Sequence, residues 1–324
     1  MAARLRARVR PRRGLALRPR RADGRAAAQR RVARAGARAL RRQVRALCAE
    51  AHALPSRALV CVDQEGGRVR RLKPARGFAE LPSAQAFAQL PEAEARAYAE
   101  ASCAEMKSLG IDFDLAPVVD LDTNPANPNI GALERSFSAD PNEVRRCVRI
   151  WDDAARRAGL GLCLKHYPGL GGAATDSHAE LTDVSDCLSK DEVALFTELC
   201  EATIGSAILL SHARVRQWDP DWPVSISAVA IGALRRALPD ALLVTDDLQM
   251  QGLRAFCSTT DAVVRALSAG ADLVCIGNNL LVEERECVHA AETLRRMAQG
   301  DASLAATLAA AQARVAARKV LCAS

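Results

Sequence analysis

The stretch GLCLKHYPG, residues 161–169, contains the pattern that decides the fold. An uncharged run leads directly into Lys165 and His166, and a Pro-Gly pair follows. A short run that is apolar throughout is typical of a strand in a parallel sheet, because such strands are covered on both faces. Five similar runs recur along the chain: Ala58–Val62, Phe113–Val119, Ser206–Leu210, Ala241–Thr245 and Asp272–Ile276.

Helix-like stretches alternate with these predicted strands. They are Glu92–Leu109, Pro141–Ala158, Lys190–Thr203, Ala228–Ala237, Thr260–Ala269 and Glu283–Ala298. The alternation predicts an α/β fold, and its spacing favours a (β/α)8 TIM-type barrel that occupies residues 43–324 as one catalytic domain. A doubly wound open sheet is the alternative, but no G-x-G-x-x-G motif follows the first predicted strand.

Ionisable side chains follow most of the predicted strands at the point where each strand ends. They are Asp63 and Glu65, Asp120 and Asp122, Lys165 and His166, His212, and Asp246 and Asp247. In a barrel the carboxyl ends of the strands build one shared site. The sequence therefore predicts that these groups converge there.

The whole-chain composition is that of a globular protein. Of 324 residues, 49% are hydrophobic and 26% charged, with no apolar run near the ~18 residues of a membrane span and no apolar segment after the first arginines. The 11 cysteines include no C-x-x-C pair, which favours a reducing compartment. We expect a cytoplasmic monomer that contacts no membrane.

Residues 1–42 differ from the rest of the chain. They contain 16 arginines and a single acidic residue, Asp23, a local charge of +15, whereas the remaining residues carry a net charge of −8. Such a segment buries little apolar surface and is predicted to be poorly ordered. A transit peptide and an anion-binding arm remain alternatives, although no aromatic residue interleaves the arginines to stack on nucleic-acid bases.

The motifs that the chain lacks narrow its chemistry. It has no H-E-x-x-H, P-loop or G-x-S-x-G motif, and nothing indicates a cofactor. Lys165 and nearby arginines disfavour a metal ion among the acidic and histidine side chains. A mixture of carboxylates and hydrogen-bonding cations instead suits a sugar.

Glycoside hydrolysis needs an ionised group on one face of the sugar and a proton donor on the other. Asp246, at a strand end, is the candidate for the ionised group. His178 is the candidate donor, because it lies at the end of the glycine-rich segment 168–178 and histidine titrates near neutral pH. Asp176 is two residues away and can hold the other imidazole nitrogen.

These features together resemble glycoside hydrolase family 3, and within it the bacterial β-N-acetylglucosaminidases of peptidoglycan recycling. The matching segments, in family order, are VDQEGGRV (62–69), LAPVVD (115–120), ERSF (134–137), residues 165–178 and TDDLQM (245–250). The resemblance implies a retaining mechanism with Asp246 as nucleophile, His178 as acid/base and Asp176 as its partner. It also implies that Asp63, Arg71, Arg135, Lys165 and His166 bind a terminal N-acetylglucosamine. The implied substrate is a β-1,4-linked muropeptide saccharide.

Three departures from the family pattern bear on the structure. Leu170 replaces a polar residue between the glycines of P-G-x-G, and the segment before Arg135 is two residues longer than usual. The first β/α unit is incomplete, because Gly14–Leu17 makes a poor strand. Two other functions stay open: a phosphorylase of the same fold, and a non-catalytic protein that binds sugar or nucleic acid.

Overall fold

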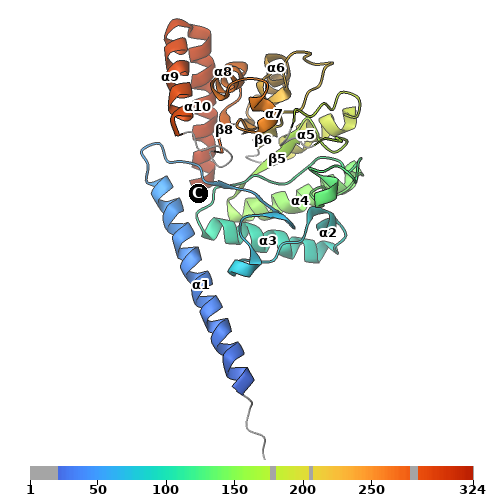
Figure 1. Ribbon diagram of the computed structural model, residues 1–324, viewed down its shortest axis with the longest axis vertical. Coiled ribbons are helices and arrows are strands. Elements are labelled where there is room, and N and C mark those ends of the chain that lie inside the picture. Colours follow the sequence, from blue (N-terminus) through green and yellow to red (C-terminus); the bar gives the residue numbers. More distant parts are fainter. Residues whose placement is uncertain (1–20, 176–179, 204–206, 278–283, 324) are drawn as a thin grey trace, which may run out of the picture.

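A parallel sheet forms the centre of the molecule in a computed structural model that describes residues 21–175, 180–203, 207–277 and 284–323 (Figure 1). Its strands are β1 Cys61–Val62, β4 Phe113–Asp114, β5 Gly161–Tyr167, β6 Ala207–Leu210, β7 Leu242–Asp247 and β8 Leu273–Cys275. They pair in parallel in that order. Because strand order follows chain order, the sheet is part of a barrel rather than a doubly wound sheet, in which the order reverses.

The barrel is incomplete in the described part of the chain. There, β1 pairs only with β4, and β8 pairs only with β7. The α/β barrel with an incomplete first unit is therefore confirmed. Gly14–Leu17, the weak candidate for a preceding strand, lies outside the described residues.

All six predicted helices are present, with ends within two residues of those expected. They are α3 Glu92–Ser108, α4 Pro141–Ala158, α5 Lys190–Ala202, α6 Ala228–Ala237, α8 Thr259–Ala269 and α9 Glu284–Gly300. Local sequence explains several ends: the side chain of Ser189 accepts a hydrogen bond from the Glu192 amide at the start of α5, and Asp140 caps α4 in the same way. The short helices α2 (Ala84–Ala88) and α7 (Gln251–Arg254) were not predicted.

Two apolar layers hold the sheet. The larger lies between the sheet and its helices and includes Phe87 and Trp151, whose ring centroids are 5.9 Å apart. The smaller, around Phe113 and Cys163, is lined by the other face of the strands. Gly161 is required here, because a Cβ atom at this position would stand 2.5 Å from the Phe113 ring.

A long last helix, α10 (Ala302–Ala323), lies against the amino-terminal ends of the strands and was not predicted. The Arg314 guanidinium binds the buried Asp272 carboxylate at 2.7 Å, just before β8. Lys319 donates to the Ser56 carbonyl at 2.6 Å, before β1. Helix α10 therefore ties the two edge strands together at this end of the sheet.

Helix α1 (Arg21–His52) extends away from the body toward its amino-terminal end (Figure 1). Its later turns are tied to the body: Arg45 donates to the Ser108 carbonyl at 3.0 Å, and His52 pairs with Asp112 at 2.8 Å. Helix α1 includes residues 21–42, and alanine and arginine both favour helix. The poor order expected of residues 1–42 stays a prediction. The division of the chain at residue 42 stays a prediction. No helix in the described ranges is long and apolar enough to cross a membrane.

Candidate active site

Lys165 is the centre of a charged cluster at the carboxyl end of the sheet. Its ammonium group lies 3.0 Å from Asp63 Oδ1 and 2.6 Å from Glu65 Oε1, and it is almost fully buried. Burial lowers the pKa of Lys165, but the two carboxylates outweigh burial and raise it. Lys165 therefore carries a fixed positive charge beneath Asp63, which is partly exposed and able to meet a ligand.

A hairpin after β1 places Arg71 beside Asp63. Strands β2 (Gln64–Gly66) and β3 (Val69–Arg70) pair antiparallel. The turn between them needs glycine: Gly66 has a φ of 101°, and a Cβ there would stand 2.0 Å from the Pro82 carbonyl oxygen. The chain returns so that Arg71 lies 3.1 Å from Asp63 Oδ2, with most of its side chain exposed.

Glu65 joins Lys165 to Arg135. Arg135 donates from Nε and from a terminal nitrogen to the two Glu65 oxygens, both at 2.8 Å. Burial raises the pKa of Glu65, but Lys165 and Arg135 reverse this and lower it to about 2. The carboxylate is therefore ionised at any working pH and fixes both cations.

A tight turn precedes Arg135. Gly131–Leu133 form a 3-10 turn, and Glu134 adopts a left-handed conformation with φ 57°. The Arg135 guanidinium reaches Glu65 from the end of this turn, and the expected extra length of this segment stays a prediction.

His166 lies between Arg135 and Asp120. A terminal nitrogen of Arg135 lies 3.0 Å from its Nε2. Its Nδ1 lies 2.6 Å from Asp120 Oδ2. Asp120 is fully buried at the end of the chain segment that follows β4.

Asp246 is the penultimate residue of strand β7, at the end of the sheet where the Lys165 cluster lies. Burial raises the pKa of its carboxyl, but the imidazoles of His212 and His166 lower it. The Asp247 amide, which donates to Asp246 Oδ1 at 2.8 Å, and Lys165 lower it further. The net pKa lies below the usual range, so Asp246 is ionised at neutral pH.

The segment after β5 is fixed at its root by backbone contacts. Leu170 is buried, and its amide donates to Asp120 Oδ1 at 2.9 Å. Asn127 donates to the Leu170 and Gly171 carbonyls, and Glu192 accepts from the Gly171 amide. Asp176 and His178, the predicted acid/base pair, lie outside the described residues.

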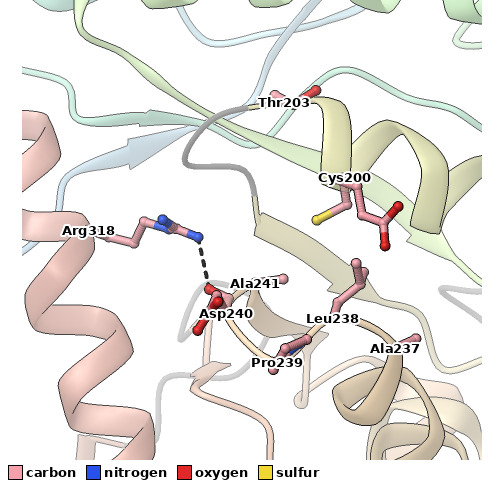
Figure 2. A pocket seen from close by; sticks show the side chains of 9 residues that line it. Cys200, Thr203, Ala237, Leu238, Pro239, Asp240, Ala241 and Arg318 are labelled. Carbon is pink, nitrogen blue, oxygen red and sulfur yellow. Dashed lines mark hydrogen bonds between the residues drawn. The ribbon is translucent and has the colours of Figure 1, made fainter.

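The cavity in Figure 2 is not this site. It measures about 270 Å³ and is lined at the opposite end of the sheet by residues such as Cys200, Leu238 and Arg318. Arg318 reaches across it to the Asp240 carbonyl at 2.9 Å. None of the predicted site residues lines it. Within the described ranges, no group of three or more His, Cys, Asp or Glu residues could hold a metal ion.

Known proteins resemble this chain over most of its length. The model of the glycosyl hydrolase family 3 N-terminal domain matches residues 28–317. The chain belongs to glycosyl hydrolase family 3. A β-hexosaminidase of Methylococcus capsulatus is 33% identical over 250 residues, which span 73% of this chain and 71% of that protein. The β-hexosaminidase LpqI of Mycobacterium tuberculosis is 33% identical over 66% of this chain and 57% of its own length.

Solved family 3 structures share the fold. The β-N-acetylhexosaminidase of Beutenbergia cavernae superposes with a TM-score of 0.73 at 30% identity, covering 81% of this chain and 78% of that one. The family 3 β-N-acetylglucosaminidase of a Paenibacillus strain gives 0.72 at 29% identity, covering 87% of this chain and 54% of its own. The resemblance found in the sequence is confirmed at the level of the family.

The structure adds three residues to the predicted set. Glu65, Asp120 and His212 touch or flank Arg135, His166 and Asp246, although the sequence indicated them only as strand-end groups. Glu65 follows Asp63 by two positions, and side chains two apart on an extended segment share a face. That alternation was the available signal. Asp120 follows β4 and His212 follows β6, so only the fold shows that Asp120 lies beside His166 and His212 beside Asp246.

Proposed function

We propose that this family 3 hydrolase is a retaining exo-β-N-acetylhexosaminidase that removes terminal N-acetylglucosamine from β-1,4-linked muropeptide saccharides in cell-wall recycling. One observation carries the proposal: an ionised Asp246 in β7 shares the carboxyl end of the sheet with Lys165, Arg135 and Asp63. The names of the relatives, β-hexosaminidases, support the substrate class.

In the proposed reaction the terminal sugar is bound by Asp63, Arg71, Arg135, Lys165 and His166. A carboxylate oxygen of Asp246 attacks the anomeric carbon, the bond to the leaving oxygen breaks, and His178 supplies that oxygen with a proton. Water then attacks the glycosyl ester and gives its proton to His178. The Asp246 carboxylate is released, so each cycle restores both groups. Asp176 orients the His178 imidazole.

Substitution of the nucleophile tests the proposal. Asp246→Asn should lower hydrolysis of a nitrophenyl β-N-acetylglucosaminide by about 10³-fold or more, because no other group can form the ester. Asp240→Asn, an exposed change at the other end of β7, is the control and should retain activity. Unchanged turnover by Asp246→Asn would refute the assignment, and an inactive parent chain would refute the proposed function.

Two further measurements resolve the reaction and the substrate. Formation of a sugar 1-phosphate when phosphate is added would assign phosphorolysis in place of hydrolysis. A higher kcat/KM for N-acetylglucosaminyl-anhydro-muramic acid than for the N-acetylglucosamine disaccharide is expected for an enzyme of muropeptide recycling. Equal values would remove the muramyl moiety from the proposal.

A further inference from the structure

Asn129 contacts two parts of the site at once. Its carbonyl accepts a hydrogen bond from the Arg135 guanidinium at 2.8 Å. Its side-chain Nδ2 donates to the Thr175 carbonyl at 2.7 Å. The residue is buried, and its own backbone is set by Asn127, whose side-chain oxygen accepts from the Asn129 amide at 2.8 Å. A buried carboxamide in so fixed a turn connects its two partners rigidly.

Thr175 in turn contacts Thr182, which lies further along the same segment between β5 and α5. Its hydroxyl donates to the Thr182 hydroxyl at 3.2 Å. Thr182 is buried, and its carbonyl accepts from the Arg214 amide at 2.8 Å, in the segment that follows β6. The pair Thr175 and Thr182, which we call the neck, therefore brings together two points seven residues apart and fixes them to the segments that follow β4 and β6.

We propose that Asn129 is a positioning residue for the reaction: it fixes the neck, Thr175 and Thr182, relative to the sugar-binding Arg135. The inference rests on the proposed function, in which residues 176 and 178, between the two neck threonines, supply the acid/base pair. Arg135 bonds to the carbonyl of Asn129, and the neck bonds to its side chain. A change confined to the side chain thus disturbs proton transfer while leaving the Arg135 contact in place.

The experiment compares two β-N-acetylglucosaminides that differ in the need for a proton. An unactivated disaccharide requires the acid, whereas a dinitrophenyl glycoside has a leaving group that departs without it. Asn129→Asp removes the Nδ2 donor and keeps the side-chain size. It should lower kcat/KM for the disaccharide by about 10-fold, from the loss of one buried hydrogen bond, and for the dinitrophenyl glycoside by less than about 2-fold.

A second variant and a control complete the design. Thr175→Val deletes the hydroxyl of the neck but keeps the carbonyl that Asn129 meets, and it should give the same selective loss even if Asn129→Asp does not fold. Asn142→Asp, at the exposed start of α4, makes the same chemical change away from the site and should alter neither rate. Equal losses on both glycosides, or no loss on either, would overturn the positioning role. A parent chain inactive on both would instead refute the proposed function.

Discussion

Glu65 determines where the Lys165 and Arg135 cations stand. Lys165 lies in β5 and Arg135 in the segment between β4 and α4, and they would repel each other if brought together alone. Glu65 lies between them, accepts from both and is buried with them. A buried ion pair costs desolvation, and removing one partner leaves the other charge uncompensated. The contribution of this carboxylate is thus to fix the positions of Lys165 and Arg135 rather than to add net stability.

Glu65→Gln is expected to raise KM for the glycoside and to lower kcat/KM by about 10- to 100-fold, because glutamine removes the negative charge between the two cations and replaces one acceptor oxygen with an NH2 donor. Steady-state kinetics on the nitrophenyl substrate measures it. Glu80→Gln makes the same change in an exposed pair with Arg70 and should stay within about 2-fold. A Glu65→Gln variant with parental kinetics would show that the cations hold their places without it.

At the scale of elements, helix α5 holds the loop that joins it to β5. Glu192, in the first turn of α5, accepts from the Leu121 amide at 3.0 Å and from the Gly171 amide at 3.4 Å. Burial, and next the neighbouring Asp120, raise its pKa from 4.5 to about 8. Glu192 is therefore protonated at neutral pH, and its carboxyl oxygen still accepts both bonds.

This raised pKa makes stability depend on pH in a definite direction. Below about pH 4.5 Glu192 is protonated in both states. Between pH 4.5 and 8 the unfolded chain releases the proton while the folded protein keeps it, so the free energy of unfolding falls as pH rises. Glu192→Gln removes this loss, because glutamine mimics the protonated acid. The free energy of unfolding of the variant should exceed that of the parent by a few kcal/mol, as an order of magnitude, between about pH 5 and 8.

Urea unfolding at several pH values measures this gain. Glu198→Gln is an exposed change on the same helix. Its free energy of unfolding should differ from that of the parent by a nearly constant amount over the same pH range. A constant gap for Glu192→Gln as well would mean that Glu192 ionises in the folded protein as readily as in the unfolded chain.

At the scale of the whole molecule, the sheet is open between β1 and β8 in the described residues, and helices at both ends of the chain compensate. Helix α10 contacts the segments that lead into both edge strands. The last turns of α1 cover the start of β4 through the pair of His52 with Asp112. An open parallel edge is prone to pair with other chains. The stability of this barrel therefore depends on its terminal helices.

Deletion of residues 1–34 is expected to leave the unfolding midpoint and the hydrolytic rate near those of the parent. The contacts that the structure describes between α1 and the body involve residues from Ala37 to His52. Deletion through residue 52 removes a partner of the buried Asp112 and should lower the urea midpoint. Urea unfolding and activity on the nitrophenyl substrate test both. Loss of folding in the shorter deletion would assign a structural role to the arginine-rich segment.

Local sequence was sufficient to predict the six main parallel strands and six of the helices, because apolar runs, helical spacing and caps lie within each element; it did not reveal α2, α7, α10 or the β2–β3 hairpin. It also placed Asp63, Lys165, His166 and Asp246 at strand ends, since the ends of parallel strands meet at one edge. The partners of those groups became visible only in the folded protein. Glu65 joins two cations, Asn129 joins a cation to a loop, and α10 links the two edges of the sheet. Each of these depends on contacts between residues distant in sequence. Local pattern contains no information on such distances, because packing sets them after the elements have formed.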